Sequence, residues 1–186
     1  MKVNLNSAFL AFSLMFSMTL ASQNTLNTLE SSLKWEGKKI TGSGHNGSLT
    51  FSDSEIKIGD DGNIISGVFT VDMTTLSCDD LTADSGKANL EGHLKSDDFF
   101  SVEKFNTATL TISSVENNNA TGVLTIKDIS HPIDFMLVKT KEGYKADLVF
   151  DRTKYNVKYA SGNFFKNLGD KLILDEIELS AQLKLK

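Results

Sequence analysis

The sequence has little cysteine and little proline, with one residue of each among 186. The lone cysteine, Cys78, excludes an internal disulfide, so the fold has to be held by its apolar core and its backbone hydrogen bonds. Neither a base nor a cation is evident near Cys78 in the sequence, which predicts a small, buried and unreactive thiol. The lone proline, Pro132, leaves nearly every backbone N–H free to join a sheet.

Clusters of basic side chains are also absent from the sequence. The chain carries 19 Lys and Arg residues against 24 Asp and Glu residues, a net charge of −5. An acidic chain without a basic patch is poorly suited to bind nucleic acid or anionic membrane surfaces. We therefore expect no nucleic-acid partner.

Signals for catalysis and for metal binding are equally sparse. The sequence contains no Gly-x-Ser-x-Gly nucleophile turn. The adjacent acids Asp97 and Asp98 do not converge as a general acid and a general base would. The histidines His45, His93 and His131 are far apart in the sequence, and no Cys, Asp or Glu forms a recognisable ligand set with them. The sequence therefore predicts no catalytic residue, no cofactor and no metal site.

Only one apolar run stands out, at residues 8–20, and it is too short for a comfortable membrane span. A single lysine precedes the run, and the small residues Thr19 and Ala21 occupy positions typical of signal-peptide cleavage. We expect a cleaved signal peptide at residues 1–21 and one secreted or periplasmic domain at residues 22–186, without stable membrane insertion. Loss of that lysine leaves 18 basic against 24 acidic residues, a net charge of −6.

The sequence is rich in alternation of apolar and polar residues with a period of two. The alternating segments are residues 48–52, 56–58, 67–74, 108–113, 124–126, 133–137, 146–150 and 173–185. Turn signals such as Asp-Asp-Gly-Asn at 60–63 separate them. This pattern predicts about eight antiparallel strands, each with one apolar and one polar face. Such strands close into a barrel or fold into a sandwich, and periodicity alone does not choose between them.

The segment NLEGHLKSDDFF interrupts the alternation with helical character. Leu90 and Leu94 are four residues apart and would share one face of a helix. Ser96 then offers an N-cap for a turn whose first residues are acidic. The adjacent rings of Phe99 and Phe100 need a large apolar place to go, which favours a lid over the mouth of a barrel.

Four motifs in the chain resemble the YceI-like family. Residues 67–73 are similar to its Gly-x-Phe-x-Val-Asp-Met strand, and residues 89–105 to its helix region with an acidic pair, Phe-Phe and Val-Glu-Lys. Residues 122–128 are similar to its Gly-x-Leu-Thr-Ile-Lys-Gly segment, although an aspartate replaces the final glycine. Residues 131–133 are similar to the x-Pro-Val strand that follows. The resemblance covers residues 31–186.

The resemblance implies an all-β, lipocalin-like antiparallel barrel of about eight strands with a short helical segment, secreted to the bacterial periplasm. It also implies a non-enzymatic carrier or buffer that holds a long isoprenoid quinone, a polyisoprenoid or another amphiphilic lipid in an apolar cavity. The candidates for contact with that ligand are Phe69, Val71, Met73, Phe99, Phe100, Leu110, Ile112, Phe135, Leu137, Leu148 and Phe150.

Each of these candidates also has a plainer role, because apolar residues inside a small barrel are more often core than ligand contacts. Two other functions stay open. A barrel with a filled interior would act through protein contacts in a stress response, and a cavity-based hydrolase would use the interior as an active site. The oligomeric state, including a homodimer, is left open as well.

Overall fold

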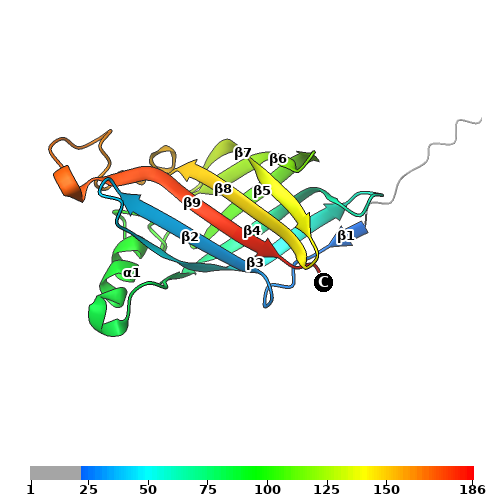
Figure 1. Ribbon diagram of the computed structural model, residues 1–186, viewed down its shortest axis with the longest axis horizontal. Coiled ribbons are helices and arrows are strands. Elements are labelled where there is room, and N and C mark those ends of the chain that lie inside the picture. Colours follow the sequence, from blue (N-terminus) through cyan, green and yellow to red (C-terminus); the bar gives the residue numbers. More distant parts are fainter. Residues whose placement is uncertain (1–21) are drawn as a thin grey trace, which may run out of the picture.

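Nine antiparallel strands and one α-helix, α1 (Lys87–Lys95), make up most of residues 22–186, which are the residues that the computed structural model describes (Figure 1). The predicted signal peptide, residues 1–21, lies outside the described residues. The strands are β1 (Ser22–Asn24), β2 (Ser32–Lys39), β3 (Gly44–Ile58), β4 (Ile64–Cys78), β5 (Thr107–Glu116), β6 (Asn119–Ile126), β7 (Ile129–Thr140), β8 (Gly143–Asp151) and β9 (Ile173–Leu183). Short 3₁₀ helices occupy Ala83–Ser85, Arg152–Tyr155 and Gly169–Lys171.

The strands β2 to β9 close into an eight-stranded barrel. Each pairs with the next in chain order, and β9 returns to pair with β2, with Trp35 opposite Leu179. The short strand β1 pairs with the far end of β3 and does not belong to the ring. Closure leaves the ring without an unpaired edge. The predicted antiparallel barrel of about eight strands is confirmed, and the sandwich alternative is excluded.

Two hairpins turn on two residues that both have a left-handed backbone. Asn117 and Asn118 have φ of 50° and 67° between β5 and β6, and Lys127 and Asp128 have φ of 53° and 58° between β6 and β7. Positive φ at both positions is the hairpin turn that matches the twist of the flanking strands, and Asn and Asp adopt it more readily than most residues. Asp128 therefore preserves the turn without the glycine that the family usually has there.

The predictions of a short helical segment and of Ser96 as the cap of a following turn are both confirmed. Ser96 also ends α1, and its Oγ accepts the N–H of Asp98 at 3.3 Å at the start of the turn at residues 97–100. Its N–H and its hydroxyl both donate to the carbonyl of His93, at 3.1 and 2.7 Å. A serine hydroxyl that bonds a carbonyl three residues back competes with the helix and here terminates it. No helix within residues 22–186 is long and apolar enough to cross a membrane.

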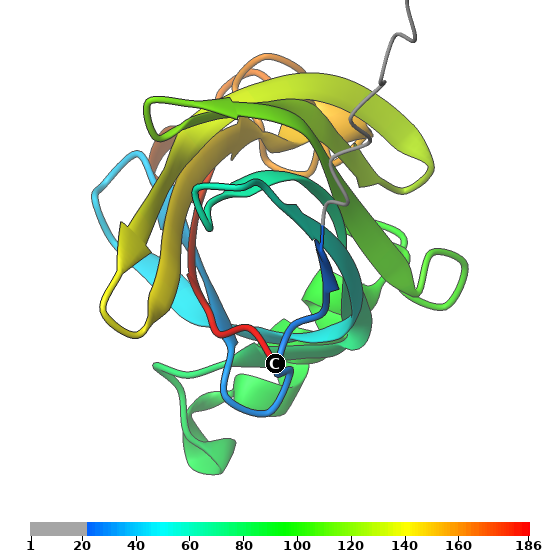
Figure 2. The same cartoon turned by 90° about the vertical axis from the view of Figure 1, so that its right-hand side faces the viewer.

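The segment before β2 runs along the rim at one end of the barrel (Figure 2). Leu26 in this segment is only 1% exposed, and its N–H donates to Ser54 Oγ at 2.7 Å. Leu26 also forms a backbone bridge with Leu185, and the N–H of Asn27 donates to the carbonyl of Lys184 at 2.8 Å. These contacts fasten the segment to the chain after β9, and the buried side chains of Leu26, Ile56 and Ile64 fill this end of the barrel and close it.

Candidate functional site

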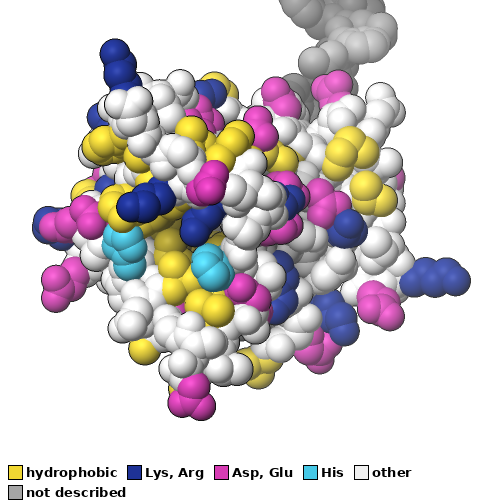
Figure 3. Space-filling view, turned by 60° about the vertical axis from the view of Figure 1, so that its left-hand side comes forward, with side chains coloured by type: hydrophobic (Ala, Val, Ile, Leu, Met, Phe, Trp, Pro, Cys, Tyr) yellow, Lys and Arg dark blue, Asp and Glu magenta, His cyan; other side chains and the backbone are white. Residues whose placement is uncertain are grey.

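The barrel encloses a cavity of about 450 Å³, which lies within the roughly 300–1,000 Å³ range of ligand pockets. All eight strands of the ring contribute to its lining, and α1 and the turn between β2 and β3 border its open end. Figure 3 shows this end of the molecule, where hydrophobic side chains gather between basic and histidine side chains. The buried residues Leu26, Ile56 and Ile64 do not line the cavity, because they pack at the closed end.

The cavity is long and narrow rather than round. On β9 its lining runs from Ile173 to Leu183, ten residue steps, or roughly 30 Å of strand at about 3.3 Å per residue. Barrel strands tilt by roughly 35–45°, so the lining extends for about 25 Å along the barrel axis. A cavity of this shape suits an extended chain better than a compact ligand.

All eleven residues predicted to contact a ligand lie on the wall of this cavity. They are Phe69, Val71, Met73, Phe99, Phe100, Leu110, Ile112, Phe135, Leu137, Leu148 and Phe150. Their contact with a ligand stays a prediction. The predicted set did not include wall residues on β2 and β9, among them Trp35, Leu179 and Ala181. The alternation of the last strand carried a signal for the β9 residues, because they share its apolar face.

An aromatic cluster covers part of the open end. The ring of His93 on α1 lies edge-on to Phe99 and to Tyr159, with centroid separations of 5.0 and 4.6 Å. Phe99 and Tyr159 lie 5.4 Å apart, and Phe100 lies beside Phe99 at 6.4 Å. The cluster joins α1, the turn after it and the loop after β8, so three segments meet over the cavity. Phe99 and Phe100 line the cavity beside these contacts, and their action as a lid stays a prediction.

Lys127 holds the turn that carries Phe99 by a hydrogen bond. This lysine lies in the turn between β6 and β7, its side chain is buried, and its ammonium donates to the carbonyl of Phe99 at 2.8 Å. A second, longer hydrogen bond of 3.4 Å reaches the carbonyl of Asn156. Burial lowers the pKa of Lys127, because water no longer solvates the charged form fully. The turn whose geometry Asp128 preserves therefore holds both the lid and the neighbouring loop.

Arg152 joins the segments on the other side of the open end. Its side chain is 1% exposed, and all five of its N–H donors have an acceptor. The acceptors are the carbonyls of Val157, Tyr159, Ile173 and Leu174 and the carboxylate of Asp175. Since a guanidinium has five donors, Arg152 has none left for a ligand. Arg152 borders the cavity as a structural anchor rather than as a binding group.

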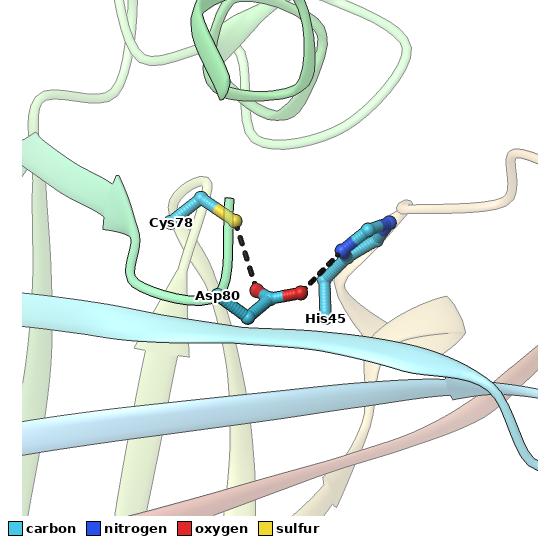
Figure 4. A group of neighbouring side chains, drawn as sticks. All are labelled: His45, Cys78 and Asp80. Carbon is cyan, nitrogen blue, oxygen red and sulfur yellow. Dashed lines mark hydrogen bonds and ion pairs between the residues drawn. The ribbon is translucent and has the colours of Figure 1, made fainter. Parts of the chain in front are cut away.

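His45, Cys78 and Asp80 converge beside the open end (Figure 4). The thiol of Cys78 donates to one oxygen of Asp80 at 3.0 Å, and Nδ1 of His45 lies 2.9 Å from the other. The prediction that no Cys or Asp accompanies a histidine is therefore wrong for His45, because strand pairing brings together residues that are more than 30 positions apart. Periodicity gave no signal for this contact.

The predicted buried and unreactive thiol fits what the structure shows. Cys78 is fully buried, and burial, followed by its hydrogen bond to Asp80, raises the pKa of the thiol. Burial also acts to raise the pKa of Asp80, but hydrogen bonds from Cys78, from the N–H of Asn46 and from His45 outweigh it and lower that pKa. The carboxylate stands between the thiol and the imidazole, and no hydrogen bond joins His45 to Cys78 within residues 22–186. The imidazole is therefore not placed as a base for the thiol.

A family model described as the YceI-like domain matches residues 25–185. No curated protein matches the sequence. Among solved structures, BcnA of Burkholderia cenocepacia is 18% identical, with a TM-score of 0.64 over 87% of this chain and 99% of that chain. A polyisoprenoid binding domain from Saccharophagus degradans, implicated in plant cell wall breakdown, is 12% identical, with a TM-score of 0.58 over 88% and 97%. At these identities the likeness shows a shared fold alone.

Proposed function

This chain belongs to the YceI-like family, and we propose that it binds one long isoprenoid or another amphiphilic lipid inside its barrel. The observation that carries the proposal is the cavity, about 450 Å³ in volume and lined by apolar side chains from every strand of the ring. One of the neighbours with the same fold is described as a polyisoprenoid binding domain. An isoprenoid quinone is the ligand class that we favour.

The distribution of polar side chains favours a lipid with a head group. The wall between the lid and the closed end is formed by apolar residues, and the polar side chains Lys38, Lys39, Ser43 and His45 border the open end. An isoprenoid tail would be buried in the wall region, where each Å² of apolar surface removed from water contributes roughly 25 cal/mol. The head group would lie at the open end, close to water.

A binding role is supported better than the two alternatives. A barrel with a filled interior does not leave a cavity of about 450 Å³. A hydrolase needs a nucleophile activated by a base, and the Asp80 carboxylate separates the Cys78 thiol from the His45 imidazole. We therefore propose a non-enzymatic carrier or buffer.

We further propose that the protein works in the periplasm or outside the cell. The apolar run and small residues before Ser22 support export, and a lone buried thiol suits an oxidising compartment because it has no intramolecular partner. N-terminal sequencing of the protein recovered from the periplasmic fraction tests this. We expect the chain to begin at Ser22, and an intact Met1 in the cytoplasmic fraction alone would overturn the export proposal.

Mass spectrometry of an organic-solvent extract tests the binding function directly. We expect the protein purified from its own cells to release an isoprenoid or a related amphiphile in a one-to-one ratio. Ala181→Phe places a ring in the cavity and should abolish the co-purifying lipid, because Ala181 lies on the wall. Val149→Phe is the matched control, because Val149 on neighbouring β8 is 52% exposed on the outer surface. The absence of any lipid from the wild-type extract, together with no binding of added isoprenoid quinone, would overturn the proposal.

A further inference from the structure

The His45, Cys78 and Asp80 cluster brings three different metal-binding groups to one point. His45 lies near the start of β3, Cys78 is the last residue of β4, and Asp80 follows in the next loop. One nitrogen, one sulfur and one oxygen atom from these side chains lie within 4.8 Å of one another. Figure 4 shows that the thiol and the imidazole both point toward the carboxylate. Two antiparallel strands and the loop between β4 and α1 thus create a compact set of donors.

The chemistry of this set matches one class of ion. Zn²⁺ binds thiolate sulfur, imidazole nitrogen and carboxylate oxygen, commonly with tetrahedral geometry, whereas Ca²⁺ and Mg²⁺ require oxygen donors. Three protein donors leave a fourth position for water, as in zinc sites that remain open. The carboxylate is already oriented, because Asp80 also accepts a hydrogen bond from the N–H of Asn46 at 3.0 Å. Such outer hydrogen bonds hold metal ligands in place.

Burial gives the cluster a closed side and an open side. Cys78 is fully buried and forms the floor, whereas the side chains of His45 and Asp80 are partly exposed. An ion can therefore approach from solvent without displacing a strand. His45 also borders the open end of the barrel cavity, so the cluster lies beside the proposed lipid site. Neither Cys78 nor Asp80 lines that cavity, so the two sites are distinct.

Neighbouring charges are compatible with a bound cation. Asp79 is paired with Lys34 at 2.6 Å, and Glu91 accepts the N–H of Cys78 at 2.9 Å while lying 3.8 Å from Lys87. The charges of Lys34 and Lys87 are thus matched by Asp79 and Glu91. The negative charge of Asp80 remains to balance the charge of the ion. Binding would break the S–H bond of Cys78, release its proton to solvent and form a metal–sulfur bond. The resulting thiolate and the Asp80 carboxylate would together neutralise the two charges of the ion.

We propose that His45, Cys78 and Asp80 bind one Zn²⁺ ion at the edge of the barrel mouth. The site contributes three protein ligands, and water completes the coordination. This assignment rests on the three side chains and not on the lipid, so it holds for lipid-free protein as well.

Cobalt substitution tests the proposal, because Co²⁺ occupies zinc sites and reports its ligands by absorption. Chelator-treated wild-type protein titrated with Co²⁺ should develop a thiolate-to-cobalt charge-transfer band that saturates at one equivalent and disappears when Zn²⁺ is added. Cys78→Ser should lose the band completely. Saturation of the wild-type protein without a charge-transfer band would overturn the assignment of Cys78 as a ligand.

Substitutions at the partly exposed residues His45 and Asp80 test the zinc site without changing the buried Cys78. His45→Gln and Asp80→Asn should each weaken Zn²⁺ binding by at least about tenfold, measured by calorimetry, because each removes one of three protein ligands; tenfold is about 1.4 kcal/mol. His131→Gln is the matched control, because His131 lies on β7 outside the cluster. Equal Zn²⁺ affinity in His45→Gln, Asp80→Asn and wild-type protein would overturn the site.

Discussion

The two ends of the barrel are covered by different means. At the closed end, the chain before β2 runs along the rim, where backbone hydrogen bonds and the buried side chain of Leu26 fasten it. At the open end, backbone hydrogen bonds join β9 to the loop after β8, but α1 and the turn after it meet that loop through aromatic rings and the side chain of Lys127. Backbone pairing gives a permanent closure, whereas side-chain contacts between loops can separate without disturbing a strand. The difference suits a container that is sealed at one end and loaded through the other.

Arg152→Met should have the largest effect, because it removes the anchor of the open end. The change leaves four carbonyls, that of Val157 buried, and the Asp175 carboxylate without the donor that Arg152 supplies. Breaking a buried ion pair from one side costs about 3–5 kcal/mol of unfolding free energy. Urea unfolding measures this loss. Lys154→Met, in the same 3₁₀ helix but exposed, should change the free energy by less than about 0.5 kcal/mol. Equal stability of the two variants would contradict the role given to Arg152.

Leu26→Ala probes the closed end in the same way. Removing a buried leucine side chain costs about 2–5 kcal/mol of unfolding free energy through lost burial and the cavity left behind. Leu29, three residues later, is 96% exposed, so Leu29→Ala should change the free energy by less than about 0.5 kcal/mol. Thermal or urea unfolding separates the two. Equal stability of Leu26→Ala and Leu29→Ala would contradict the role given to the Leu26 side chain at the closed end.

The double variant Phe99→Ala, Phe100→Ala should loosen the lid while leaving the barrel folded. We expect bound lipid to dissociate about tenfold faster, equivalent to about 1.4 kcal/mol of lost contact, because both rings border the cavity at its open end. Transfer of the lipid to acceptor vesicles measures the rate. Phe164→Ala, Phe165→Ala is the control, since these rings lie on the exposed loop after β8 and outside the cavity wall. If the Phe99→Ala, Phe100→Ala variant retains lipid as long as the wild-type protein, the two rings have only a structural role.

Acid should lower the stability of the protein through carboxylates at both ends of the barrel, with a smaller effect than the substitutions above. Hydrogen bonds from Asn63 lower the pKa of Asp61 near the closed end, and Lys104 lowers the pKa of Asp97 near the open end. A folded-state pKa below the ordinary value of 3.8 contributes stability above pH 3.8 that is lost as pH falls through the folded-state pKa.

The measurement is the thermal midpoint between pH 5 and pH 2.5 at low and high salt. Asp97→Asn should remove a salt-sensitive part of the acid-induced fall, because salt screens its ion pair with Lys104. Asp61→Asn should remove a part that depends little on salt, because its main partners are hydrogen bonds from Asn63. Identical salt dependence in the two variants would contradict this difference between the ends.

The antiparallel strands could be predicted from the sequence, because a period-two pattern is a local property that survives in every strand of the ring except β2, which no alternating segment covered. The same pattern placed Phe69, Leu110 and Phe135 on the inner face, and the structure puts them on the cavity wall. The choice between barrel and sandwich required the pairing of β9 with β2, which no local pattern contains. It came from the resemblance to a family and not from periodicity.

The open end was harder to predict, because its contacts join residues distant in the sequence. Ser96 can cap either end of a helix, and in the folded chain it serves both ends, because its hydroxyl donates to the His93 carbonyl and accepts the N–H of Asp98. Arg152 and the His45, Cys78 and Asp80 cluster depend on loops brought together by barrel closure. Side chains that join loops therefore could not be predicted from the sequence, whereas the period-two pattern placed many of the strand side chains that line the cavity.

Fluorescence of the single tryptophan tests the central claim most directly. Trp35 lies on the cavity wall, where its indole N–H donates to the Ser77 carbonyl at 3.1 Å, so a quinone bound in the barrel would quench it. Titration of lipid-free protein with an isoprenoid quinone should give quenching that saturates at one equivalent in wild-type and Val149→Phe protein and is lost in Ala181→Phe. Quenching that is absent from the wild-type protein, or that persists unchanged in Ala181→Phe, would contradict lipid binding inside the barrel.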